Sequence, residues 1–424
     1  MKVGLALAEQ SSGLYAVGYD VRLSSPLLAQ ALLTGINAGG SDVVSLGLAP
    51  TPAVAFYSRG KAGGAIITAS HNPPEYNGIK IFDQRGASIP QSGYTSLLSR
   101  SGAGLASWNA LGNSKASEGL YRYIEDIASA YGKGRGWRVG LDPGNGATTV
   151  TAPLAFTLCG TSVSTMNLAP DGTFPGRGSE PDETSLSGLS ELVRARGLEI
   201  GFGFDGDGDR VAVVDEKGKL VPPDLALGFV AAQSVSANGG GTVVANIDVS
   251  AIVDLMVESA GGKVVRSKVG DTYVLEELMK SGGVFGGEGC GAWIHPDKSP
   301  CPDGVLSALI FMDMLEESHL KPSQVGSGLP EFHLTRRKLI CPDELRPKVM
   351  ASVKELLTSM LPGSKFTEMD GIRADMPDRS WVLVRPSGTE PLIRVTAESV
   401  SESRSYALAS QVVDAVEQLK VKLR

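Results

Sequence analysis

The sequence has few cysteines, and none of them forms a pair at a metal-binding spacing. Its 424 residues include four cysteines, at positions 159, 290, 301 and 341. Such scattered thiols exclude the disulfide framework that holds small secreted domains together. Cys290, His295 and Cys301 are close in the sequence, but their spacing fits no common zinc site.

Long apolar runs are also missing. No stretch of about 18 or more apolar residues occurs, and the initial "MKVGLALAEQ" lacks the plan of a signal peptide. We therefore expect a cytoplasmic chain with no membrane partner. The net charge of −7 argues against nucleic acid as a partner but leaves room for a local phosphate site. No pattern indicates an oligomeric state.

A weak repeat organises most of the chain. Residues 16–47, 138–167 and 243–268 each read as a strand, a turn containing aspartate, a helix and a second strand. Each repeat is a βαβ unit, which predicts a mainly parallel sheet covered by helices. A smaller α+β domain is expected after about residue 338. We therefore predict four domains around a central cleft, at 1–133, 134–232, 233–340 and 341–424.

The segment after each repeat is an apolar strand that runs into a polar loop. The three segments read "GGAIITASHNP", "EIGFGFDGDGDR" and "GGVFGGEGCGA". Ligands of parallel sheets bind beyond the carboxyl ends of the strands, so the three loops are expected to line one cleft.

The loop "DGDGDR" predicts a site for a hard cation. Asp205, Asp207 and Asp209 alternate with glycines that allow a tight fold. Without a cation, their mutual repulsion is expected to raise their pKa values. An EF-hand is excluded, because Arg210 replaces its glycine and strand residues follow directly. Three carboxylates with open coordination positions suit Mg²⁺.

The segment "RPSGTEPLIR" predicts a phosphate site. Ser387, Gly388 and Thr389 form a turn that offers hydroxyls and N–H groups, and Arg385 and Arg394 flank it. No Walker A motif is present.

Ser70 in "TASHNP" lacks the motif and partners of an acyl nucleophile. A cation loop and a phosphate turn elsewhere favour phosphoryl transfer, in which Ser70 carries the phosphoryl group and bridges to the cation. His71 and Lys80 supply donors nearby. Glu288, in its glycine-rich loop, is a candidate acceptor for sugar hydroxyls, and Lys268 precedes the next predicted helix.

Together, "TASHNP", "DGDGDR", "GGE" and "RPSGTEP" resemble the α-D-phosphohexomutase family, and the resemblance covers essentially the whole chain. It implies a phosphohexomutase that interconverts hexose 1- and 6-phosphates of mannose, glucose or glucosamine. It further implies one Mg²⁺ per chain, a hexose 1,6-bisphosphate primer, and a hinged C-terminal domain. By position, the resemblance assigns Ser70 as the phosphoserine, Asp205, Asp207 and Asp209 as Mg²⁺ ligands, Glu288 as a sugar contact, and Arg385, Ser387, Gly388, Thr389 and Arg394 as the holders of the phosphate that does not react.

Two departures from the family pattern stand out. Members usually begin with a strand and an arginine turn before the first helix, whereas residues 1–10 resemble the middle of that helix. The sugar loop often reads Glu-x-Ser-Gly-His, whereas this chain has Glu288, Cys290 and Ala292. Cys290 is a weaker hydrogen-bonding partner for a sugar than serine.

Several alternatives remain open from the sequence. Lys80, His71 and Arg210 are candidates for the general acid or base. The segment "VGDTYVLEEL" resembles phosphoglucosamine mutases, and "PDGTFPGRGSEP" resembles phosphomannomutases. A non-catalytic phosphosugar-binding protein and a metal-dependent sugar phosphatase are the competing functions.

Overall fold

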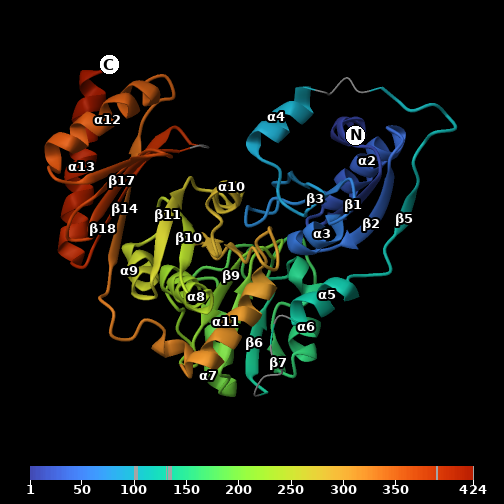
Figure 1. Ribbon diagram of the computed structural model, residues 1–424, viewed down its shortest axis with the longest axis horizontal. Helices are drawn as coiled ribbons and strands as arrows, with labels where there is room; N and C mark the ends of the chain where they lie inside the picture. Colours follow the sequence, from blue (N-terminus) through green and yellow to red (C-terminus); the bar gives the residue numbers. More distant parts are fainter. Residues whose placement is uncertain (100–103, 130, 132–135, 388–389, 424) are drawn as a thin grey trace.

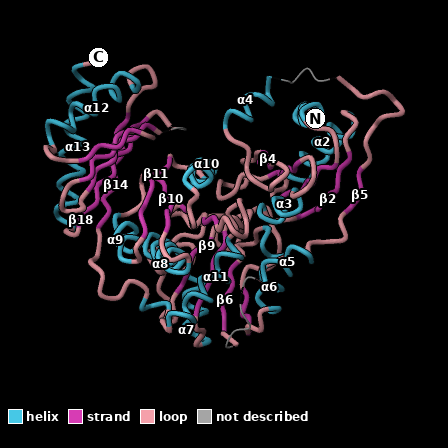
Figure 2. Tube along the Cα trace, viewed as in Figure 1, coloured by secondary structure: helices cyan, strands magenta, loops and turns pink. Residues whose placement is uncertain are grey.

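The computed structural model describes residues 1–99, 104–129, 131, 136–387 and 390–423. These residues form four sheets that follow one another along the chain, and Figure 1 shows the first and the fourth at opposite ends of the view. Figure 2 shows the same four groups of strands in magenta. Within the described ranges, no helix is both long enough and apolar enough to cross a lipid bilayer.

The first three sheets share one topology, which confirms the predicted repeat. In each, the first strand lies between the second and the third and is parallel to both, and the fourth strand is antiparallel to the third. The first sheet also gains a parallel edge strand, β5. The strands are β1 (Leu14–Tyr19), β2 (Asp42–Leu48), β3 (Gly63–Ile67), β4 (Ile79–Phe82) and β5 (Ser114–Ala116); β6 (Arg138–Asp142), β7 (Ser162–Thr165), β8 (Ile200–Phe204) and β9 (Val211–Val214); and β10 (Gly241–Asn246), β11 (Gly262–Ser267), β12 (Phe285–Gly287) and β13 (Trp293–Ile294).

Helices cover these three sheets. Grouped by their order in the chain, α1 (Lys2–Gln10), α2 (Ser25–Ala38), α3 (Thr51–Ser58) and α4 (Gln91–Ser99) go with the first sheet; α5 (Tyr121–Ala128), α6 (Ala152–Leu158) and α7 (Ser187–Arg196) with the second; and α8 (Pro223–Ala237), α9 (Ala251–Ser259), α10 (Asp271–Ser281) and α11 (Gly304–Ser318) with the third. We call each sheet with its helices a unit. Residues 1–10 are largely helical, as expected, and α1 packs on α2.

The fourth unit is an antiparallel sheet with two helices, as the α+β prediction requires. Its strand order is β14-β18-β17-β16-β15, and it has a hydrophobic core of its own. Its elements are β14 (His333–Ile340), α12 (Arg346–Met360), β15 (Lys365–Glu368), β16 (Ile372–Asp375), β17 (Trp381–Pro386), β18 (Leu392–Ser399) and α13 (Glu402–Lys422). The expected boundary after residue 340 needs correction, because β14 pairs along its whole length with β18 and so belongs to this sheet.

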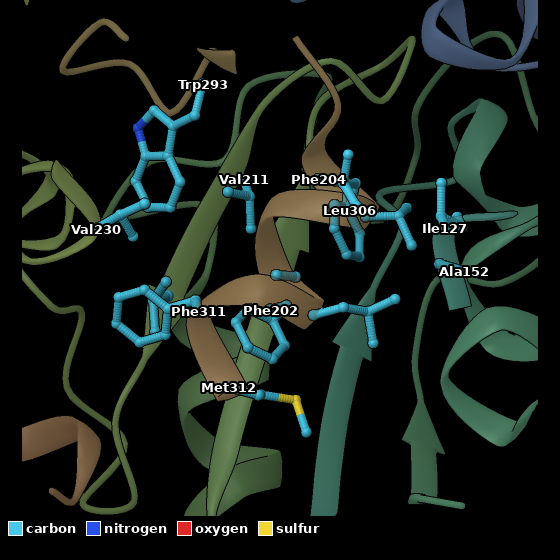
Figure 3. Packing of buried hydrophobic residues seen from close by; sticks show 14 of the residues in the cluster. Ile127, Ala152, Phe202, Phe204, Val211, Val230, Trp293, Leu306, Phe311 and Met312 are labelled. Carbon is cyan, nitrogen blue, oxygen red and sulfur yellow. The ribbon is translucent and has the colours of Figure 1, made fainter. Parts of the chain in front are cut away.

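One continuous hydrophobic core joins the first three units. Helix α11 of the third unit packs on β8 and β9 of the second. Figure 3 shows Leu306, Phe311 and Met312 of α11 beside Phe202 and Phe204 of β8. This packing fixes the polar loop after β8 relative to the loop after β12.

A buried polar anchor joins the fourth unit to the third. The Arg373 guanidinium donates to the carbonyls of Ile247 and Val249 at 2.6 and 3.0 Å and lies 4.0 Å from the centre of the Trp381 ring. The buried Glu398 carboxylate accepts from the Ala251 N–H at 2.8 Å, at the start of α9, and from the Trp381 indole at 2.6 Å. The fourth unit is thus hydrogen-bonded to the segment that connects β10 to the start of α9.

We expect Arg373→Met to destabilise the protein by about 2–4 kcal/mol, because it leaves two buried carbonyls without donors. Calorimetric unfolding would show a lower transition temperature. Arg379→Met is the matched control, since Arg379 pairs with Glu258 across the same two units but both side chains are about half exposed. An exposed pair is worth about 0–1 kcal/mol. Equal losses in the two variants would contradict the expectation.

Candidate active site

Ser70 lies where β3 ends, in a strained turn. Its φ is +51°, in the left-handed region that residues other than glycine rarely adopt. Its N–H donates to the Thr68 hydroxyl at 2.9 Å, and Thr68 in turn donates to Asp20 at 2.8 Å. The strained turn points the Ser70 hydroxyl at the second unit, where it donates to Asp205 Oδ2 at 2.8 Å.

Arg22 holds this turn from inside the first unit, and the sequence analysis missed it. Its buried guanidinium donates to the carbonyls of Ser70 and Asn72, both at 2.7 Å, and also to those of Pro73 and Tyr76. Asp20 anchors it through a 3.0 Å ion pair. The only sequence signal was an Asp-x-Arg turn after the first strand, which reads as an ordinary strand–helix connection.

The cation loop connects β8 to β9 and lies directly against Ser70. A Cβ on Gly206 would come within 2.6 Å of the Ser70 carbonyl, and Gly208 has a φ of +77°. Glycine is therefore required at both positions for the loop to approach the serine. The N–H groups of Gly208 and Arg210 donate to Asp205 Oδ1 at 2.9 and 3.2 Å.

The three aspartates fit a hard cation. Asp205, Asp207 and Asp209 are buried, and one carboxylate oxygen from each lies within 4.8 Å of the others. Within the part of the chain that the structure describes, the Oδ1 atoms of Asp207 and Asp209 are buried without a hydrogen-bond partner. Buried carboxylate oxygens are costly to leave unpaired, and they are the ligands Mg²⁺ prefers. The donor set therefore suits Mg²⁺, and the Ser70 hydroxyl lies beside it.

The expectation that all three pKa values rise is wrong for one residue. Burial raises the pKa of Asp205, and the carboxylates of Asp209 and Asp207 raise it further. Burial and Asp207 likewise raise the pKa of Asp209. Burial also acts to raise the pKa of Asp207, but the Lys80 ammonium and the Thr51 hydroxyl outweigh it, so that this pKa is lowered.

Lys80 and Thr51 of the first unit contact the group of three aspartates, Asp205, Asp207 and Asp209, which we call the triad. Lys80, on β4, places Nζ at 2.9 Å from Asp207 Oδ2 and 2.5 Å from Asp209 Oδ2. Thr51 begins α3; its hydroxyl donates to Asp207 Oδ2 at 2.5 Å and its N–H to the Asp207 carbonyl at 2.8 Å. The structure thus brings the predicted Lys80 to the triad, whereas Thr51 was not predicted.

His71 and Arg210 also lie at the triad. His71 Nδ1 is 3.4 Å from the Ser70 hydroxyl, and burial together with the nearby Arg210 lowers the pKa of His71 to about 4. Arg210 Nη1 lies 3.1 Å from both carboxylate oxygens of Glu180. Glu180 was not predicted, although the segment that contains it was noted.

The sugar-loop candidates all belong to the third unit. Glu288 Oε1 accepts from the Asn246 amide at 2.6 Å and from the Gly270 N–H at 2.8 Å. Burial raises the pKa of Glu288 to about 7, although the Gly270 bond opposes the shift. Cys290 is exposed and free. Lys268 is exposed, with Nζ 5.4 Å from the Tyr273 ring centre.

The phosphate turn borders a cavity of about 490 Å³. Arg385 and Ser387 line it together with Val269 of the third unit and Arg346 of α12, which was not predicted. Arg346 also donates to the Glu390 carbonyl at 2.8 Å, within the turn. Arg394 pairs with Glu390 at 3.1 Å. Gly388 and Thr389 lie outside the described residues.

Comparison with known proteins agrees with this architecture. Four domain models described as phosphoglucomutase/phosphomannomutase match residues 1–101, 121–218, 223–332 and 340–415. A Methanopyrus kandleri protein named "Probable phosphoglucosamine mutase" is 38% identical, covering 100% of this chain and 95% of its own. A relative of the same name from Pyrococcus abyssi is 38% identical over 96% of this chain and 91% of its own.

Solved structures agree as well. A phosphoglucomutase/phosphomannomutase family protein from Burkholderia thailandensis superposes with a TM-score of 0.87 at 27% identity, covering 98% of this chain and 93% of that one. Fold and loops together define an enzyme that transfers phosphoryl groups within sugar phosphates. The chain belongs to the phosphoglucomutase/phosphomannomutase family and is a hexose phosphate mutase.

We expect Glu288→Gln to change how stability depends on pH. The pKa of Glu288 in the folded protein, about 7, exceeds its ordinary value of 4.5. Between pH 4.5 and pH 7 the folded protein therefore holds a proton on Glu288 that the unfolded protein has lost. The stability of the wild type falls as the pH rises through this range. Glutamine keeps an oxygen acceptor for Asn246 and Gly270 but does not ionise.

The stability difference in favour of Glu288→Gln should therefore grow by up to about 3 kcal/mol between pH 4.5 and pH 8. Urea unfolding of both proteins at several pH values measures this difference. A difference that stays constant over the range would contradict the assignment.

Proposed function

We propose that this chain interconverts glucosamine 1-phosphate and glucosamine 6-phosphate, with Ser70 as the phosphoryl carrier. The observation that carries the proposal is the Ser70 hydroxyl, held at 2.8 Å from Asp205 within a buried triad suited to Mg²⁺. The sugar is proposed from the relatives that cover nearly the whole chain, which bear the name phosphoglucosamine mutase.

The proposed chemistry is two phosphoryl transfers. In the first, a sugar hydroxyl gives its proton to a base and attacks the phosphorus of phosphorylated Ser70. The bond from phosphorus to Oγ breaks, and Oγ leaves with the electron pair and takes up a proton. The bisphosphorylated sugar then reorients, and Oγ loses its proton and attacks the phosphorus of the other phosphate. The bond from that phosphorus to the sugar oxygen breaks and the sugar oxygen takes up a proton, which restores the phosphoserine and leaves the isomeric monophosphate. One Mg²⁺ on the triad would offset the charge of about −2 on phosphoserine.

The proposed roles of the other residues follow from their contacts. His71, Lys80 and Arg210 remain the candidates for the proton-transferring group, since all three border Ser70 or the triad. We assign Glu288, Cys290 and Lys268 to the sugar. Arg385, Ser387 and Arg394, with Gly388 and Thr389 of the same turn, are assigned to the phosphate that does not react, and Arg346 is added to them because it lines the same cavity.

The purified chain should be assayed with Mg²⁺ and a hexose 1,6-bisphosphate primer on the 1-phosphates of glucosamine, glucose and mannose. We expect isomerisation with the highest kcat/KM for glucosamine 1-phosphate, complete loss with EDTA, and recovery with added Mg²⁺. A preference for glucose or mannose would reassign the sugar. Net release of phosphate would favour the phosphatase, and binding without turnover would favour the non-catalytic relative.

We expect Ser70→Ala to lower kcat by roughly 10³-fold or more, because alanine removes the hydroxyl proposed to carry the phosphoryl group. Intact-mass spectrometry of the wild type incubated with primer should show one added phosphoryl group, which the variant lacks. Ser12→Ala is the control, since Ser12 is an exposed serine away from the site. Phosphorylation that persists in Ser70→Ala would contradict the proposal.

A further inference from the structure

Residues 170–181 of the second unit, which we call the clasp, run between β7 and α7 and reach across to the Ser70 turn. The Ser179 hydroxyl donates to the carbonyls of His71 and Asn72 at 2.6 and 3.0 Å. The Phe174 ring lies 5.3 Å from the Arg22 guanidinium that holds the same turn. The clasp therefore contacts both the turn and the residue that shapes it.

The clasp is itself firmly anchored. Arg177 forms a 2.8 Å ion pair with Asp142, at the end of β6, and both side chains are almost fully buried. Its guanidinium also donates to the carbonyls of Asp142 and Phe204, at the ends of β6 and β8. Glu180, three residues further on, is thus carried by a rigid segment.

Glu180 and Asp209 lie on two sides of the Arg210 guanidinium. Nη1 of Arg210 is 3.1 Å from both Glu180 oxygens, and its Nε is 4.0 Å from Asp209 Oδ1. This Nε and this Oδ1 are both buried without a hydrogen-bond partner among the described residues. A small swing of the guanidinium would close this gap into a charge-assisted bond.

We propose that Glu180 is a positioning residue that holds Arg210 off Asp209. It thereby keeps Asp209 Oδ1 available to the cation and the guanidinium N–H groups available to the substrate phosphate. Without Glu180, the nearest carboxylates to Arg210 belong to the triad, and Arg210 would compete with the cation for Asp209. This inference rests on the proposed Mg²⁺ site but goes beyond the proposed reaction.

The test is the Mg²⁺ dissociation constant, measured by isothermal titration calorimetry on the full chain without substrate. We expect Glu180→Gln to raise the Mg²⁺ dissociation constant roughly tenfold. Without the Glu180 charge, Arg210 pairs with Asp209 in the cation-free protein, and the cation must displace it. Glu183→Gln removes the same charge from an exposed position on the following turn, and it should change the constant by less than about twofold.

A double-mutant cycle with Arg210→Met separates positioning from a plain charge effect. If Glu180 acts through Arg210, adding Glu180→Gln to the Arg210→Met variant changes its Mg²⁺ dissociation constant little further. An equal change in both backgrounds, or an unchanged constant in Glu180→Gln, overturns the inference. A wild type that binds no Mg²⁺ would overturn both the inference and the proposed cation site, so the two failures are distinguishable.

Discussion

The arrangement of the first three units depends on the mutual repulsion of three buried carboxylates. Asp205, Asp207 and Asp209 are 0%, 0% and 5% exposed, so water cannot screen their charges. Several neighbours of the triad act to offset that charge. Lys80 and Thr51 arrive from the first unit, and backbone N–H groups of the loop itself complete the set.

The need to hold these charges at fixed distances explains why one hydrophobic core runs through the first three units while the fourth unit has a core of its own. Charges in a low-dielectric site interact strongly only when their distances are fixed. Helix α11 supplies that rigidity by packing on β8 and β9, and the Gly304 N–H at its start donates to the Gly208 carbonyl in the cation loop at 3.1 Å. The phosphate turn needs no such fixed distance to the triad, because its proposed role is to hold the end of the substrate that does not react. It lies on a unit with its own core.

Sequence reasoning found those parts of the site whose chemistry is contiguous in the chain. The three aspartates alternate within one loop, and Ser70 follows a buried strand, so spacing and strand ends were sufficient to predict them. The repeat also predicted that their loops occupy equivalent strand ends, which the three matching sheets confirm. By contrast, the residues that Arg22, Thr51 and Glu180 contact lie 48, 156 and 30 positions away in the sequence. Only the sheet order and the packing of the units bring these residues to the site, and neither can be read from local spacing. The lowered pKa of Asp207 was missed for the same reason, since it depends on Lys80 from a different sheet.

The residues of the third unit that the fourth unit contacts are neighbours in sequence of the two residues that hydrogen-bond to Glu288. Arg373 holds the Ile247 carbonyl, and Asn246, the preceding residue, donates its amide to Glu288 at 2.6 Å. The second donor to Glu288 is the Gly270 N–H, next to Val269, which lines the cavity of the phosphate turn. Both donors that orient the Glu288 carboxylate are therefore one residue away from a contact with the fourth unit. A displacement of that unit large enough to move Ile247 or Val269 would also change the orientation of Glu288. The fourth unit has its own core and meets the third through a few buried polar contacts and one small hydrophobic cluster, which includes Ile247 and Trp381. Such displacements are therefore less costly than any within the larger shared core of the first three units. Glu288, the proposed sugar contact, is thus mechanically linked to the unit that carries the phosphate turn, whereas Ser70 and the triad are held independently of it.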